Sequence, residues 1–125
     1  MKNLNIDGTQ STPAIRADWN EGVLEISGDS YPENSFQVYA PVIKWVQDFL
    51  NTATGPLSLQ LNLLYLNTSS VKVMMDLFDL LQDAHGNGRK VSVVWQYDHE
   101  NERVAELALE FKEDCEFPFD IRAKG

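Results

Sequence analysis

Hydrophobic and polar positions switch along this chain between the two-residue period of strands and the 3.6-residue period of helices. Strands are predicted at residues 14–17, 23–27, 57–66, 91–97 and 117–122. Helices are predicted at residues 35–51, 69–85 and 101–112. The resulting order, β-β-α-β-α-β-α-β, predicts an α/β domain with a mixed β-sheet, helices packed on it and right-handed crossovers.

Details of the same pattern give further expectations about the fold. Residues 1–12 are predicted to be a loose lead-in, which leaves 13–125 as a single domain. The strand at 57–66 is nearly continuous in apolar residues in its second half, which predicts a strand covered on both faces. Pro41 lies inside the first helical pattern and predicts a kink or a second helix start there.

The junction between the third strand and the second helix is rich in small polar residues, with Asn67 followed by Thr68, Ser69 and Ser70. Ser, Thr or Asn at the N-cap of a helix satisfies backbone N–H groups that have no partner within the helix. The amino end of a helix also favours a phosphate group. The junction is therefore either a cap with spare hydroxyls or a site where a hydroxyl is phosphorylated.

The second helix has a wider apolar arc than one sheet buries. At 100° per residue, Val71, Met75 and Phe78 lie on a flank between the core face and the acidic outer face. A loop or a neighbouring helix could cover this flank. Alternatively, it is a docking strip beside Thr68, for which the flexible side chain of Met75 is suited.

The loop before the first helix is the other candidate site. Tyr31, Glu33, Asn34 and Ser35 supply several hydrogen-bonding side chains there. Such residues are ordinary in turns and caps, and they are also common where loops bind partners. Because loops at the same ends of α/β strands cluster, we expect this loop to lie near Thr68.

Composition narrows the class of partner. Ten basic and 19 acidic residues give a net charge of −9, which disfavours nucleic acid and anionic membrane surfaces. The amino-terminal residues lack the apolar core of a signal peptide, and no apolar run is long enough to cross a membrane. We therefore expect a cytoplasmic protein.

Motifs for catalysis, cofactors and metals are missing from the sequence. The chain has no phosphate-binding loop, nucleophile elbow or dinucleotide fingerprint, and its two histidines and one cysteine have no zinc-site spacing. We predict no metal, no cofactor and no enzymatic activity. A small α/β enzyme that uses the many carboxylates is the rival hypothesis, although no spacing requires it.

Two segments together resemble a known family. Ser30-Tyr31-Pro32-Glu33-Asn34-Ser35 and Tyr65-Leu66-Asn67-Thr68-Ser69-Ser70 are similar to motifs of the SiaC family of bacterial regulatory phosphoproteins, whose fold is like that of STAS-type anti-sigma-factor antagonists. Trp95-Gln96-Tyr97 and Phe117-Pro118-Phe119 also fit, so the resemblance extends from about Pro13 to Phe119.

The resemblance implies a partner switch centred on Thr68. A dedicated kinase with a histidine-kinase-type ATPase fold would phosphorylate Thr68, and a PP2C-like phosphatase would remove the phosphate. The unphosphorylated form would bind and activate a GGDEF diguanylate cyclase, raising cyclic di-GMP and promoting aggregation and biofilm formation. A constitutive STAS-like scaffold, or an anti-sigma-factor antagonist with another target, is the alternative. The implied partner surface comprises Tyr31, Glu33, Asn34, Ser35, Asn67, Ser69, Ser70, Val71, Met75 and Phe78.

Overall fold

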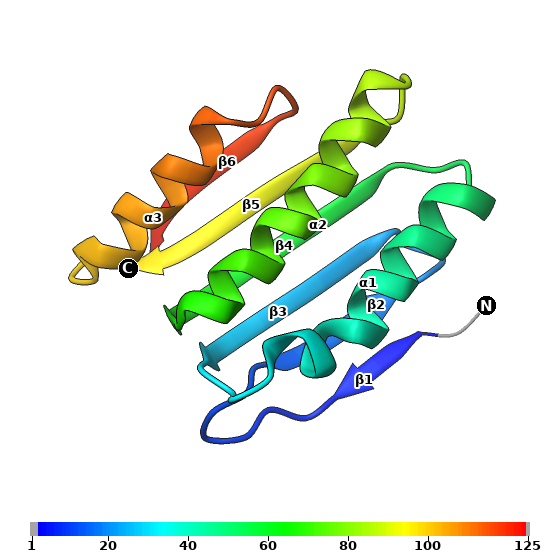
Figure 1. The fold of residues 1–125 in the computed structure, drawn as a ribbon. Helices are drawn as coiled ribbons and strands as arrows, with labels where there is room; N and C mark the ends of the chain where they lie inside the picture. The colour runs from blue at the N-terminus through cyan, green and yellow to red at the C-terminus, as the bar shows by residue number, and fades with distance from the viewer. Residues whose placement is uncertain (1–2, 125) are drawn as a thin grey trace.

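A computed structural model describes residues 3–124 and shows a six-stranded sheet with three helices (Figure 1). The strands are β1 (Leu4–Ile6), β2 (Ala14–Asp18), β3 (Val23–Ser30), β4 (Leu57–Leu66), β5 (Val91–Asp98) and β6 (Phe119–Lys124). The helices are α1 (Ser35–Thr52), α2 (Thr68–Gly86) and α3 (Glu102–Glu113). The predicted α/β class, the mixed sheet and the element order from Ala14 onward are confirmed.

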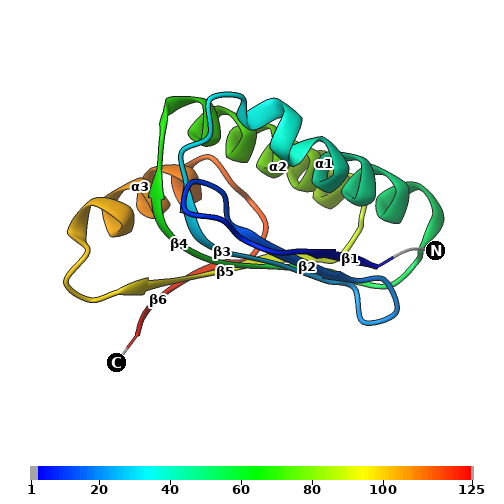
Figure 2. The ribbon, with the colours of Figure 1, turned by 90° about the horizontal axis from the view of Figure 1, so that it is seen from below.

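The strands lie in the sheet in the same order as in the sequence. The pairs β1–β2 and β2–β3 are antiparallel, whereas the pairs β3–β4, β4–β5 and β5–β6 are parallel. Each crossover steps in the same direction, so crossovers of one hand place every helix on the same face of the sheet. Figure 2 shows α1, α2 and α3 together on that face.

The other face of the sheet is open, and β4 shows this in its side chains. Its alternate leucines from Leu57 to Leu63 are buried under the helices, whereas Ser58, Gln60 and Asn62 are only half-buried on the opposite face. The prediction that β4 is covered on both faces is therefore wrong. The apolar run that suggested it ends in a β-bulge.

The bulge lies where β3 and β4 approach the helix starts. Gly28 is aligned with Leu63 and Asp29 with Tyr65, so Leu64 is an extra residue in β4. Leu64 and Tyr65 are consequently both exposed. Asn101 Nδ2 donates to the Leu64 carbonyl oxygen at 3.0 Å.

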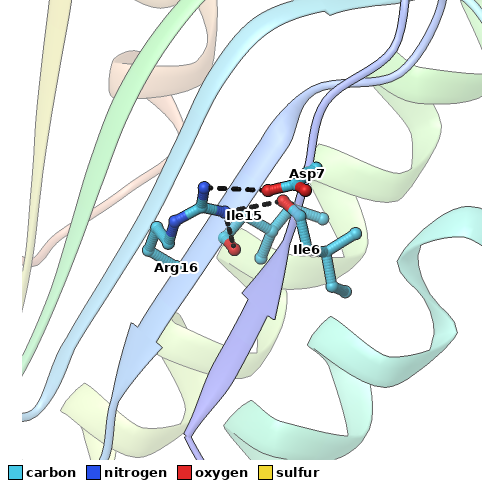
Figure 3. A network of polar contacts seen from close by, with 4 residues as sticks. All are labelled: Ile6, Asp7, Ile15 and Arg16. Carbon is cyan, nitrogen blue, oxygen red and sulfur yellow. Dashed lines mark hydrogen bonds and ion pairs between the residues drawn. The ribbon is translucent and has the colours of Figure 1, made fainter.

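The predicted loose lead-in over residues 1–12 is wrong at residues 4–6, which form β1 beside β2. Arg16 holds this short edge strand in place (Figure 3). Its Nη1 donates to the carbonyl oxygens of Ile6 at 2.7 Å and Ile15 at 3.0 Å, and its Nη2 lies 3.2 Å from Asp7 Oδ1. Residues 1–2 of that prediction, and residue 125 of the predicted domain, lie outside the described residues.

Helix α1 continues through Pro41 with no second start. Proline removes the N–H that would bond to the carbonyl of Gln37, one turn earlier. Both residues are exposed, so water can solvate that carbonyl. The helix therefore tolerates Pro41.

Candidate functional site

The carboxyl ends of β3 and β4 meet the amino ends of α1 and α2 at one edge of the sheet. The N–H of Asn67 donates to the Ser30 carbonyl oxygen at 2.9 Å. Its side-chain Nδ2 donates to the Pro32 carbonyl oxygen, also at 2.9 Å. The loop that contains Tyr31 and Ser35 is thus tied to the start of α2, and the predicted proximity of this loop to Thr68 is confirmed.

Asn67, and not Thr68, caps helix α2. Asn67 Oδ1 accepts the backbone N–H of Ser70 at 2.9 Å. Thr68 is the first residue of the helix, and its side chain is exposed. Among residues 3–124 its hydroxyl has no hydrogen-bond partner. The predicted exposure of Thr68 at the start of the second helix is confirmed, and Thr68 does not serve as the cap.

The start of α1 lies directly beside the start of α2. Asn34 caps α1 by accepting the N–H of Gln37 at 3.2 Å. Ser35, the first residue of α1, has its Oγ 2.7 Å from Ser69 Oγ of α2. The positive ends of two helix dipoles therefore meet at Thr68, and neither helix has an acidic residue in its first turn.

Beneath Thr68, five hydroxyl groups form a hydrogen-bonded chain. Tyr39 Oη lies 2.8 Å from Ser30 Oγ, which lies 2.7 Å from Ser70 Oγ. Ser35 Oγ lies 2.9 Å from Ser70 Oγ and connects it to Ser69. We call this chain, with Asn67 Oδ1 at its end, the hydroxyl relay. Burial raises the pKa of Tyr39 to about 12, although its hydrogen bond with Ser30 partly offsets this, so the phenol remains protonated.

Four residues predicted to contact a partner belong to the relay, and two of them are fully buried. Ser35 and Ser70 have no exposed surface, so the prediction that they contact a partner directly is wrong. Their hydroxyls are buried because the two helix starts pack together there. Ser69 and Asn67 are half-buried at the outer end of the relay.

The surface around Thr68 is aromatic and aliphatic. Tyr31 and Tyr65 are 39% and 49% exposed, and their rings meet edge-on with centroids 6.0 Å apart. Met75 is also exposed, and Val71 is half-buried. Glu33 and Asn34 are exposed.

Leu64 and Tyr65 are exposed at this edge, although the sequence pattern did not predict a surface role for either residue. The available signal was the unbroken run Leu63-Leu64-Tyr65-Leu66, which departs from strand alternation and marks the bulge. A bulge beside a site commonly redirects side chains.

Phe78 does not belong to the exposed surface. It is 4% exposed, and its ring packs against Trp95, Phe111 and Phe119. Its assignment to a docking strip is wrong because α3 and β6 cover that part of the flank. The exposed part of the strip consists of Val71 and Met75.

The sequence comparison identifies the family. A family model described as SiaC family regulatory phosphoprotein matches residues 6–124. The chain belongs to the SiaC family. Members of this family are described as regulatory phosphoproteins, which agrees with an exposed hydroxyl at the meeting point of two helix dipoles.

Relatives from Pseudomonas aeruginosa match over nearly their full lengths. An uncharacterized protein is 61% identical over 98% of each chain. The crystal structure of apo-SiaC is 59% identical, covers 98% of this chain and 100% of its own, and has a TM-score of 0.95. A crystal structure of the diguanylate cyclase SiaD in complex with its activator SiaC contains a chain that is 61% identical, with a TM-score of 0.94 and coverage of 97% and 99%.

The described residues of this SiaC-family chain offer neither a metal-binding cluster nor a membrane-spanning helix. Residues 3–124 contain no cluster of three or more His, Cys, Asp or Glu side chains that could hold a metal ion. None of the helices in that range is long and apolar enough to span a membrane. Burial, followed by the charges of Asp114 and Asp79, raises the pKa of the Cys115 thiol to about 11, which makes it a poor nucleophile.

Proposed function

We propose that this chain is a partner-switching regulator whose state is set by phosphorylation of Thr68. The unphosphorylated form binds and activates a GGDEF diguanylate cyclase, and the phosphorylated form releases it. The SiaD complex of the 61% identical SiaC protein supports the choice of partner. The family description supports the choice of modification.

The observation that carries the proposal is that the Thr68 hydroxyl has no hydrogen-bond partner within residues 3–124, while Asn67 caps the helix. Phosphorylation of a capping hydroxyl would remove a contact that the helix needs. Phosphorylation of Thr68 removes no such contact, so the modification can be added and removed without unfolding α2.

The two helix starts explain why the fold tolerates the phosphate. Phosphothreonine carries about −1.5 to −2 charges and three acceptor oxygens. Free backbone N–H groups at the first residues of α1 and α2, together with their dipoles, favour such a group.

A partner docked over Thr68 would not tolerate the phosphate. Tyr31, Tyr65 and Met75 are exposed near Thr68, and a partner that covers them would also enclose the phosphate. Enclosing a dianionic phosphate for which the partner supplies no counter-charge costs on the order of 3 kcal/mol or more. About 1.4 kcal/mol already weakens binding tenfold, so one phosphate is sufficient to release the partner.

Two further enzymes act on Thr68 in this switch. A kinase with a histidine-kinase-type ATPase fold adds the phosphate, and a PP2C-like phosphatase removes it. The chain itself acts as a regulator without catalysis, in the cytoplasm, where the cyclase finds its nucleotide substrate. The SiaC family resemblance supports these assignments.

Calorimetric titration of the cyclase with unmodified and Thr68-phosphorylated protein tests the proposal. We expect the phosphorylated form to bind at least about tenfold more weakly. Phosphatase treatment should restore the affinity, which controls for damage during preparation. Thr68→Asp should weaken binding less than phosphate does, because one carboxylate carries about half the charge. Equal affinities of the two forms would favour a constitutive scaffold instead.

A further inference from the structure

We propose that the hydroxyl relay selects Thr68 as the phosphorylated residue by withholding the hydroxyls of Ser69 and Ser70, and that Ser35 is the positioning residue that holds Ser69. The inference rests on the proposed phosphorylation of Thr68. Three hydroxyl residues stand in succession at the start of α2, and the sequence alone does not indicate which of them is phosphorylated.

The relay ends at an acceptor that cannot donate. Nδ2 of Asn67 donates to the Pro32 carbonyl oxygen and its Oδ1 accepts the Ser70 N–H, so the orientation of the amide is fixed. In the described part of the chain, only Ser69 and Ser35 bring a hydroxyl near Oδ1, at 3.2 and 3.5 Å. A hydroxyl hydrogen that no other hydroxyl of the relay accepts must therefore be donated to Asn67 Oδ1 by Ser69 or Ser35.

This end point gives the buried part of the relay a single direction. Each hydroxyl has one hydrogen to donate. Tyr39, Ser30 and Ser70 are fully buried, and a buried donor without an acceptor is costly. Every hydrogen finds an acceptor only if Tyr39 donates to Ser30, Ser30 to Ser70 and Ser70 to Ser35.

Two arrangements use the short contact between Ser35 and Ser69 and give the hydrogen of the half-buried Ser69 an internal acceptor. Either Ser35 donates to Ser69 and Ser69 donates to Asn67 Oδ1, or Ser69 donates to Ser35 across the 2.7 Å contact and Ser35 donates to Asn67 Oδ1. Ser70 is enclosed altogether. Of the three successive hydroxyls, Thr68 alone is exposed and free of hydrogen bonds within the described residues.

Phosphoryl transfer requires the freedom that Thr68 has. The hydroxyl oxygen forms a bond to the γ-phosphorus of a nucleoside triphosphate, and the bond from that phosphorus to the bridging oxygen breaks. The electron pair of the broken bond leaves with the nucleoside diphosphate, and the hydroxyl hydrogen passes as a proton to a base of the kinase. Ser69 can follow this course only by giving up its contacts with Ser35 and Asn67.

The test is phosphopeptide mass spectrometry of variants expressed in the native cell. Thr68→Ala should carry less than about a tenth of the wild-type phosphate on residues 68–70. Adding Ser35→Ala to Thr68→Ala should raise phosphate on Ser69 at least tenfold. Adding Tyr39→Phe instead is the matched control, because it removes a buried hydroxyl of the relay but leaves the Ser35–Ser69 contact. The double variant with Tyr39→Phe should carry no more phosphate on Ser69 than Thr68→Ala alone.

The outcomes separate this inference from the function on which it rests. Wild-type protein without phosphate on Thr68 would overturn both. Phosphate on Thr68 of the wild type, with no gain on Ser69 when Ser35 is replaced, would overturn only the selection by the relay. Should Ser35→Ala fail to fold, judged by circular dichroism, Ser35→Cys keeps a side chain of similar size with a weak hydrogen-bonding group, and the same gain on Ser69 is expected.

Discussion

Two adjacent residues, Asn67 and Thr68, divide two tasks at the start of α2. The amide of Asn67 stabilises the junction by accepting from Ser70 and donating to the Pro32 carbonyl. Thr68 contributes a hydroxyl that the helix does not use. This division separates the stability of the junction from the chemistry that can occur on it.

Substitution of each residue by alanine should therefore have unequal effects on stability. Asn67→Ala should lower the free energy of unfolding by about 1–2 kcal/mol, because it removes the cap. Thr68→Ala should change the free energy of unfolding by less than about 0.5 kcal/mol, as expected for an exposed side chain whose hydroxyl has no hydrogen bond within residues 3–124. Urea denaturation followed by circular dichroism measures both values. Equal losses would mean that the Thr68 hydroxyl is needed for capping in solution.

Cys115 should react slowly with alkylating agents. Its thiol has a pKa raised to about 11 by burial and by the charges of Asp114 and Asp79. At pH 8 the reactive thiolate should be about a hundredfold scarcer than in an ordinary cysteine peptide. The rate of alkylation by iodoacetamide should rise about tenfold per pH unit up to about pH 11. Asp79→Asn should increase the rate at pH 8, and a plateau near pH 9 would contradict the raised pKa.

At the scale of elements, the sequence predicts what depends on local pattern. The change of period at Leu66, followed by Asn67, located the end of β4 and the start of α2 within a residue or two. β1 has only three residues, which is too short a run for alternation to predict a strand, so its pairing with β2 could not be predicted. The run from Leu63 to Leu66 departs from strand alternation, but identifying Leu64 as the extra residue requires the register between β3 and β4, which one sequence does not reveal.

The edge strand β1 gives the prediction at this scale. Arg16→Ala should speed amide hydrogen exchange at Leu4–Ile6, because Arg16 donates to the Ile6 carbonyl oxygen. The global free energy of unfolding should fall by less than about 1 kcal/mol, since the ion pair with Asp7 is exposed. Hydrogen exchange followed by mass spectrometry measures the local effect.

Asp7→Asn is the matched control for this edge. It removes the ionic contact and leaves the two bonds from Arg16 to backbone carbonyls. Exchange in β1 should therefore change much less than in Arg16→Ala. The same acceleration in both variants would show that the ion pair, and not the carbonyl contacts, holds the strand.

At the scale of the whole molecule, the one-directional strand order places all helices on one face of the sheet and aligns their amino ends at one edge (Figure 1). The candidate site follows from that alignment, because residues 30–35 and 65–70 are brought together only there. Sequence reasoning found both segments and located Thr68 correctly. The sequence does not distinguish the buried residues of the predicted partner surface from the exposed ones. Ser35, Ser70 and Phe78 are enclosed by contacts between elements far apart in the sequence.

Alanine variants of Phe78 and Met75 distinguish a residue that packs in the core from one that contacts a partner. Phe78→Ala should lower the free energy of unfolding by about 3–5 kcal/mol, because Phe78 joins α2 to Trp95, Phe111 and Phe119. Met75 is 51% exposed, so Met75→Ala should cost less than about 0.5 kcal/mol. If the cyclase docks beside Thr68, Met75→Ala should instead weaken its binding about fivefold or more, corresponding to about 1 kcal/mol.

Leu109 on α3 is the matched control for Met75. It is 53% exposed, lies outside the predicted partner surface and should tolerate alanine with no change in cyclase affinity. Calorimetric titration of the cyclase with both variants, alongside urea denaturation, separates lost contacts from lost folding. The expected pattern is weakened binding for Met75→Ala alone, at unchanged stability. Unchanged binding for Met75→Ala, or equal weakening for Leu109→Ala, would place the docking surface away from the exposed flank of α2.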